Sequence, residues 1–172
     1  MADLIETKYQ AEIKQSEIDH HTPTAGAMCG HIISNLWLLD IKWHQSKWYL
    51  KGNLAPVFTQ IYQKLNNEAQ QQIDTLGYLL RDEAEIVPAT MQEFNQYTQI
   101  KEDPRIKYYD AKDILKTTVT DLLMADLFIT RAIKLAEKED KPALQNYLTQ
   151  MLGGNLHHIR QFENVVGEIK LE

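Results

Sequence analysis

The chain has 172 residues, 44% hydrophobic and 24% charged, which is enough for one domain with a substantial core. Its formal net charge of −6 argues against passive attraction to nucleic acid by the field of the whole chain. The single cysteine, Cys29, excludes an intrachain disulfide framework and fits a cytoplasmic protein. No run of ~18 apolar residues is present to span a membrane, and no secretory signal is recognised.

The first predicted element is a short helix over residues 3–17, and a polar hinge is predicted over residues 17–23. Isolated helices of this length are marginal in water, so this one must lean on another part of the protein. We therefore expect two parts, residues 1–21 as N-terminal helix and hinge and residues 22–172 as the main body. Apolar side chains recur in the short helix at helical spacing: Leu4, Ile5, Tyr9 and Ile13.

A long apolar helix is predicted to start near Thr22, with Pro23 at its first position, and to run to Lys51 with Gly52 as its cap. Its apolar side chains cover more than one core-facing stripe. A helix that is apolar on more than one face needs a second burial surface, and another subunit would supply one.

The second long helix is predicted to open at Pro56 and to run to about Arg81. The connector over residues 82–109 is long for a loop and should hold structure of its own. A short helix over residues 90–97 fits there.

Asp110 with Asp113 resembles a capping box that opens the third long helix. The fourth is predicted to begin at Pro142 and to end at Gly167. No strand pattern is found, so the predicted fold is all-α, a four-helix bundle with a short helix in its connector. Such a bundle could be an enzyme, a storage shell or a scaffold.

Three stretches carry recognisable motifs: residues 47–52 read Lys-Trp-Tyr-Leu-Lys-Gly, residues 88–94 read Pro-Ala-Thr-Met-Gln-Glu-Phe and residues 158–162 read His-Ile-Arg-Gln-Phe. In this order they resemble the Dps family, the DNA-protection mini-ferritins. The first matches the family's His-Trp-x-x-x-Gly apart from the histidine, and the second is similar to its Pro-x-(Ser/Ala)-Thr-Leu-x-Glu-(Phe/Tyr). Residues 158–162 are similar to His-x-Trp-Met-(Phe/Leu) in the last helix. The resemblance covers roughly residues 22–167, and the extra N-terminal helix is similar to that of the lactic-acid-bacterial branch.

The resemblance implies a ferritin-like bundle and a homo-oligomeric shell of twelve subunits. The family oxidises Fe(II), usually with peroxide, stores the ferric mineral inside and often binds DNA outside. Its iron site lies between two subunits. One gives two histidines twelve residues apart, and the other gives Asp and Glu one helical turn apart.

Transferred to this sequence, the two histidine positions are Lys47 and Thr59, and the carboxylate positions are Asp74 and Tyr78. Only Asp74 is kept. An ammonium has no lone pair for a metal, so the usual ferroxidase centre is expected to be degenerate. Asp74 is expected to form an ion pair with Lys47 across the interface. Amides largely replace the family's cavity acids on the second helix, which puts iron storage in doubt: Gln60, Gln63, Asn66, Asn67, Gln70, Gln71 and Gln72.

Two other groups could bind a divalent cation such as iron. Asp40 and His44 lie one turn apart on the first long helix, and Asp126 lies on an inward-facing stretch of the third, so a site inside one bundle is one interpretation. A hydrogen-bonded structural role is the other. The run Asp19, His20 and His21 is interpreted either as a solvated hinge or as a surface divalent-metal site.

The N-terminal helix offers two lysines, Lys8 and Lys14, as DNA contacts, among five acidic residues. Because this composition repels phosphate, we expect any DNA binding there to use divalent cations as bridges. The favoured function is a nucleoid-associated Dps-like shell that binds and protects DNA. The first alternative is an iron-oxidising and iron-storing mini-ferritin with non-standard ligands such as Asp40, His44 and Asp74. The second is a helical interaction protein with no metal role.

Overall fold

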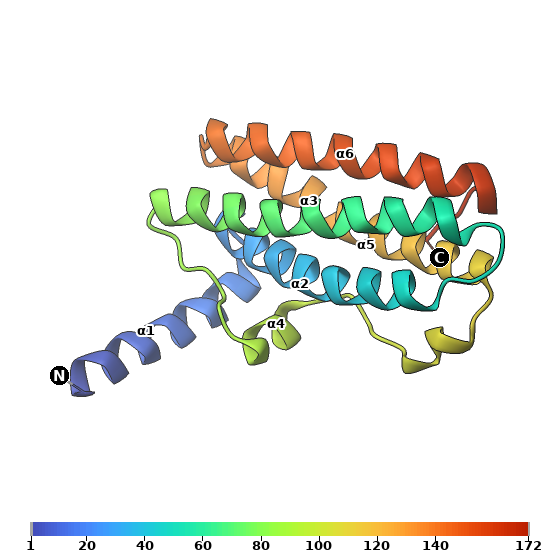
Figure 1. Ribbon diagram of the computed structural model, residues 1–172. Coiled ribbons are helices and arrows are strands. Elements are labelled where there is room, and N and C mark those ends of the chain that lie inside the picture. Colours follow the sequence, from blue (N-terminus) through green and yellow to red (C-terminus); the bar gives the residue numbers. More distant parts are fainter. Residues whose placement is uncertain (1, 172) are drawn as a thin grey trace.

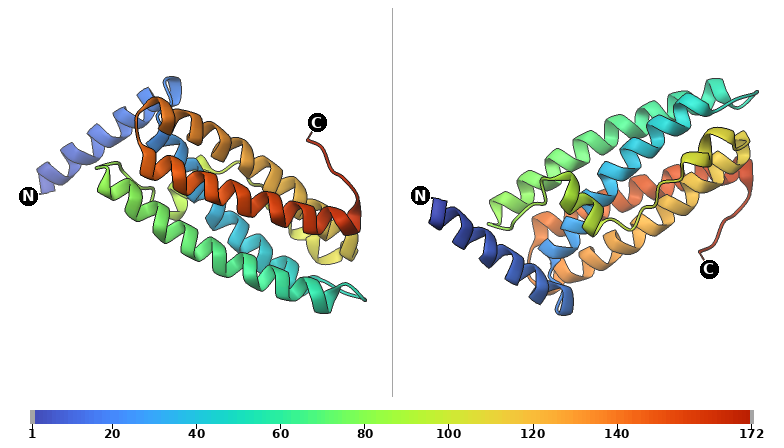
Figure 2. Two further views of the ribbon diagram at one scale, coloured as in Figure 1. Left: turned by 90° about the horizontal axis from the view of Figure 1, so that it is seen from above. Right: turned by 90° about the horizontal axis from the view of Figure 1, so that it is seen from below.

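The computed structural model describes residues 2–171, with the side chains of Ala2 and His20 excepted, and every regular element in this part of the chain is helical. α2, α3, α5 and α6 lie side by side as a four-helix bundle, in which α2 packs on α3 and α5, and α5 packs on α6 (Figures 1 and 2). The elements in chain order are α1 (Ala2–His21), α2 (Ala25–Tyr49), α3 (Ala55–Asp82), α4 (Met91–Tyr97), the 3-10 helix η1 (Pro104–Tyr108), α5 (Ala111–Lys138) and α6 (Pro142–Val166).

One core runs along the bundle, and the four long helices all contribute to it. Branched aliphatic residues at helical spacing account for most of the core, as their inward stripes predict. The hydroxyl of Tyr62, fully buried, lies 2.7 Å from that of Thr118, so its polar end is satisfied. Fully or almost fully buried members include Ile33, Leu39, Leu65, Leu76, Leu115, Leu122, Leu144 and Leu148.

Several predicted helix boundaries are confirmed. Asp110 accepts a hydrogen bond from the backbone N–H of Asp113 at 2.9 Å and opens α5. Pro142 is the first residue of α6, and Gly167, with φ of +88°, lies directly after its end. Thr90 and Glu93 form a reciprocal capping box that opens α4.

The predicted hinge over residues 17–23 begins too early, because α1 continues to His21 and only residues 22–24 lie between α1 and α2. The first long helix does not start near Thr22. It starts at Ala25, where the side chain of Thr24 accepts the N–H of Ala27 at 3.1 Å, and it ends at Tyr49. Charged and polar residues suggested a loop, yet each of residues 17–21 costs at most about 0.7 kcal/mol relative to alanine in a helix, so tertiary context can override this preference.

The connector between α3 and α5 is fixed to α2 by buried polar side chains. Lys42, 5% exposed, donates to the carbonyl of Lys101 at 2.8 Å and pairs with Asp121 at 2.5 Å. Burial raises the pKa of Asp121, although the Lys42 ammonium opposes this. Asn35, also buried, accepts from Thr98 Oγ1 and from the N–H of Gln99, each at 2.9 Å. These contacts hold α4 and η1 against α2.

A charged cluster joins the ends of all four long helices. Lys141 Nζ lies 3.1 Å from Glu83, 2.7 Å from Glu85 and 3.3 Å from Glu139. Glu139 also accepts the backbone N–H of Ala25, at the N-terminus of α2, at 2.8 Å. The cluster therefore holds the start of α2 against the end of α3 and the α5–α6 turn.

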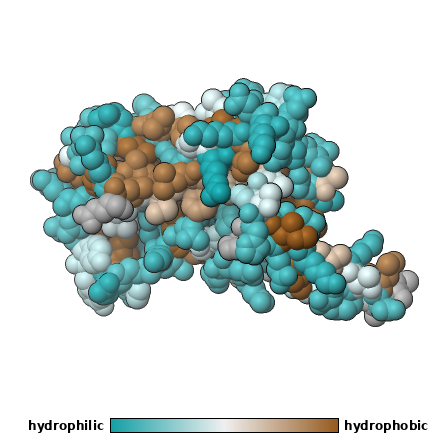
Figure 3. All heavy atoms as spheres, turned by 180° about the vertical axis from the view of Figure 1, so that it is seen from behind, coloured by the Kyte–Doolittle hydropathy of each residue, from teal (hydrophilic) through white to brown (hydrophobic). Residues whose placement is uncertain are grey.

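Large apolar side chains remain exposed on the bundle as well as on α1. Seen from behind, the molecule carries a broad apolar area between hydrophilic ends (Figure 3). None of the described helices is long and apolar enough to cross a membrane. Exposed large apolar residues of the bundle include Trp48, Val57, Tyr78, Leu127 and Leu156.

Candidate functional site

The ammonium of Lys47 is held by amide oxygens of its own subunit. Lys47 lies in the last turn of α2, half-buried, and its Nζ donates to Gln63 Oε1 at 2.8 Å and to Asn66 Oδ1 at 3.4 Å. Gln63 in turn donates to Asn67 Oδ1 at 3.1 Å. A protonated amine in this setting is a donor with no free electron pair, so Lys47 repels a cation rather than binding one.

The other three positions implied by the resemblance all lie on α3. Thr59 is half-buried near the start of the helix, whereas Asp74 and Tyr78 are exposed near its end. Fifteen residues of helix between Thr59 and Asp74 span about 22 Å. One subunit therefore cannot bring both pairs of positions to one metal ion, and a shared site requires a second copy. An ion pair of Asp74 with Lys47 across that interface stays a prediction.

Asp40 and His44 are engaged by amides of α3. Asp40 is 8% exposed, and its two carboxylate oxygens accept from Asn66 Nδ2 at 2.7 Å and Gln70 Nε2 at 2.8 Å. His44 Nδ1 lies 2.8 Å from the same Asn66 nitrogen. A metal bound here would have to displace these hydrogen bonds, whose loss in a buried setting is costly.

Asn66 and Gln70 are the residues of this site that sequence reasoning missed as partners of Asp40. The spacing of Gln63, Asn66, Asn67 and Gln70 is i, i+3, i+4 and i+7, which places all four on one face of α3. This spacing can be seen in the sequence, but a row of amides on one helix face is equally typical of a face exposed to solvent or lining a cavity. Only the packing of α3 on α2 shows that this face meets Asp40.

Asp126 does not join Asp40 and His44. It lies on the α5–α6 side of the bundle, where Oδ1 accepts from Asn155 Nδ2 at 2.7 Å and Oδ2 is buried without a hydrogen-bond partner. Burial raises the pKa of Asp126 to about 6, although the Asn155 hydrogen bond opposes the shift. Among the described residues, no three His, Cys, Asp or Glu side chains are grouped closely enough to hold a metal ion.

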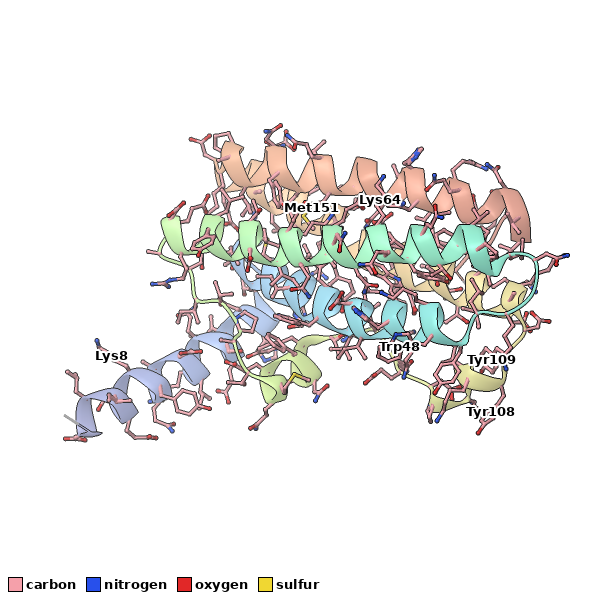
Figure 4. The ribbon with its side chains drawn as sticks, viewed as in Figure 1. Lys8, Trp48, Lys64, Tyr108, Tyr109 and Met151 are labelled. Carbon is pink, nitrogen blue, oxygen red and sulfur yellow. The ribbon has the colours of Figure 1, made fainter. Side chains whose placement is uncertain are left out.

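His158 is buried and hydrogen-bonded inside the bundle. Its Nε2 lies 2.6 Å from Glu68 Oε2, and Glu68 also pairs with Lys64 at 3.5 Å. A groove of about 300 Å³ lies beside this pair between α3 and α6. Lys64 and Met151 are labelled along the same two helices in Figure 4. Glu68 supplies the one carboxylate among the described residues that line the groove. The lining residues are Glu68, Gln71, Gln72, Thr75, Tyr147, Gln150 and Met151.

The cluster Asp19, His20 and His21 ends α1 instead of forming a hinge. Asp19 accepts from Gln15 at 2.9 Å, His21 is exposed, and the His20 side chain lies outside the described part of the chain. Consecutive residues on a helix leave the axis about 100° apart, so these three do not naturally face one ion. The surface metal site stays a prediction.

α1 projects from one end of the bundle as an arm (Figure 1). Lys8, labelled in Figure 4, and Lys14 are both exposed on it. They share the arm with five carboxylates, of Asp3, Glu6, Glu12, Glu17 and Asp19. The arm therefore carries a net negative charge, and direct attraction to a polyanion is weak.

The comparisons with known proteins agree on one family. The ferritin-like domain pattern matches residues 30–171. The solved structure of DpsB from Lactococcus lactis is 40% identical with a TM-score of 0.92, and the match covers 98% of this chain and 97% of that one. The solved structure of DpsA from the same organism is 36% identical with a TM-score of 0.89, and the match covers 95% of this chain and 96% of that one. The DNA protection during starvation protein of Listeria innocua is 23% identical over 83% of this chain and 91% of its own length.

Proposed function

Because this chain belongs to the Dps family of ferritin-like proteins, we propose that it protects DNA by associating with it as a closed shell of identical subunits. The observation that carries this proposal is the 40% identity and the TM-score of 0.92 to DpsB over almost the whole of both chains. The curated relatives are named for DNA protection during starvation. Association with DNA would place the protein in the cytoplasm, at the nucleoid.

The exposed apolar side chains of the bundle support assembly with further copies. Side chains such as Trp48, Tyr78 and Leu127 are more than half exposed in one subunit, and burying them stabilises a closed oligomer. Twelve subunits of 20.0 kDa give a particle of about 240 kDa. Light scattering coupled to size-exclusion chromatography should show one species of this mass. A monomer or dimer at micromolar concentration would contradict the shell.

The usual iron centre of the family is proposed to be inactive in this protein. The support is chemical: Lys47 offers an ammonium and Thr59 a weak neutral ligand where imidazoles would bind Fe(II), and Tyr78 replaces a carboxylate. Stopped-flow oxidation of Fe(II) by peroxide should then match a blank without protein.

A gain-of-function variant sharpens this test. Lys47→His, Thr59→His and Tyr78→Glu together, with Asp74 kept, should oxidise Fe(II) well above the blank, whereas alanine at the same three positions should not. Oxidation by the unmodified protein, lost in Asp40→Asn or His44→Ala, would favour the alternative of a mini-ferritin with non-standard ligands. Oxidation lost only in Asp74→Asn would instead show that the usual centre still operates.

DNA binding is proposed to occur through α1, with divalent cations bridging its carboxylates to phosphate. Lys8 and Lys14 are exposed and would contact phosphate directly. The arm has a net negative charge, so its carboxylates would need divalent cations between them and the phosphates. A gel shift should lose binding when a chelator is added and regain it with Mg²⁺. Lys8→Ala with Lys14→Ala should weaken binding, whereas Lys64→Ala, which removes an exposed lysine on α3, should not. Binding that survives chelation and disappears in mild salt would point to direct lysine contacts.

A further inference from the structure

α1 presents one face to the rest of the protein. Glu12, Ser16 and Asp19 are half-buried, whereas Leu4, Ile5 and most other residues of the helix are exposed. The spacing i, i+4 and i+7 places the three half-buried residues on one stripe of the helix. Ser16 is the middle residue of that stripe. Its hydroxyl lies 3.0 Å from the hydroxyl of Tyr97, the last residue of α4.

Tyr97 is itself held firmly against α2. Its backbone carbonyl accepts from His31 Nδ1 at 2.6 Å, and its ring meets the His31 ring edge-on at 5.7 Å. The next two residues, Thr98 and Gln99, both donate to the buried Asn35. Tyr97 therefore has little freedom to move, and its hydroxyl is a fixed point on the surface of the bundle.

A straight helix needs two attachment points to have a defined direction. The first is the short link to α2, where Pro23 restricts the backbone. The second, at Ser16, lies about 7 Å further along the axis, and about 20 Å of helix extends beyond it toward the N-terminus. Loss of the second point would allow the free end of the arm to swing widely.

We propose that Tyr97 is a positioning residue that sets the direction of the α1 arm through its hydroxyl contact with Ser16. The inference rests on the proposed function in one respect, that the arm is the element that meets DNA. The Tyr97–Ser16 contact keeps twelve arms at the same angle on the shell. A common angle lets several arms of one particle meet the same DNA, which raises affinity through multivalency.

Two variants remove one oxygen each from this contact. Tyr97→Phe keeps the backbone carbonyl that accepts from His31 and the aromatic ring that packs on the His31 ring. Ser16→Ala introduces alanine, a good helix former, so α1 itself is preserved. Each should raise the rate of tryptic cleavage after Lys14 in the assembled protein by roughly 2- to 12-fold, the range expected for one hydrogen bond. The double variant should be no faster than either single one, because both remove the same interaction. Ser16→Thr keeps the hydroxyl and should cleave at the unmodified rate.

Tyr9→Phe is the matched control, since it removes an exposed hydroxyl of the same arm and should change nothing. Unchanged cleavage in Tyr97→Phe, or effects of the two variants that simply add, would overturn the anchor. The cleavage measurement needs no DNA, so it stands even if the protein proves not to bind DNA. If the unmodified shell binds DNA, the variants should bind it several-fold more weakly in the gel shift. Full DNA affinity with an accelerated cleavage rate would overturn the positioning role.

Discussion

Asp126→Asn should change how the stability of the protein depends on pH. The carboxyl of Asp126 is 8% exposed, has one hydrogen-bond partner, Asn155, and faces no cation in the described contacts. Burial raises its pKa from 3.8 to about 6, so the folded state binds this proton more tightly than the unfolded chain. Protonated Asp126 therefore contributes its full share of the unfolding free energy below pH 4, and this share is lost as the pH rises through 6.

The shift of about two pKa units corresponds to about 3 kcal/mol of unfolding free energy between pH 4 and pH 7. The variant cannot ionise and should lack this loss. It introduces a buried NH₂ in place of Oδ2, which costs about 1–3 kcal/mol, but at every pH. The difference in unfolding free energy between variant and unmodified protein should therefore move in favour of the variant by about 3 kcal/mol over this range.

Guanidinium unfolding followed by circular dichroism, at fixed subunit concentration, measures this difference at several pH values. Asp113→Asn, at an exposed acid of the same helix, is the control and should give a smaller pH dependence. A difference for Asp126→Asn that stays flat from pH 4 to pH 7, or moves in favour of the unmodified protein, would refute the reasoning. Either result would mean that the Asp126 carboxyl is better solvated or paired in the assembly than in one subunit.

Three further predictions concern the bundle itself. Lys42→Met should destabilise the protein by about 3–5 kcal/mol, because it leaves Asp121 buried without its cation; the double change with Asp121→Leu should recover much of the loss in the same unfolding assay. Gly26→Ala places a Cβ 2.5 Å from the carboxyl carbon of Glu85 and should cost about 1 kcal/mol, a cost absent from a Glu85→Ala background. Burial raises the pKa of Cys29 to about 12, so iodoacetamide at pH 8 should label it only after unfolding, and rapid labelling of the native protein would contradict its buried position.

The sequence by itself determined the order of the six α-helices in the described part of the chain and several of their ends, but it did not predict the 3-10 helix η1. Apolar residues at helical spacing, Pro142 at a first position and Gly167 after a last one are local signals, and local backbone physics is enough to interpret them. The sequence also showed that Lys47 and Tyr78 stand where the resemblance expects metal ligands. It misplaced the hinge, since the same polar residues suit a loop and a solvent-facing helix equally well.

The tertiary structure decided which side chains meet. Asp40 with Asn66, Lys42 with Asp121 and Ser16 with Tyr97 are 26, 79 and 81 residues apart in the chain, and no periodicity within one helix reveals such pairs. Each contact depends on how a helix is rotated about its axis and on which neighbour it packs against. Those two quantities follow from the packing of all four long helices together, so they are fixed only once the bundle has formed.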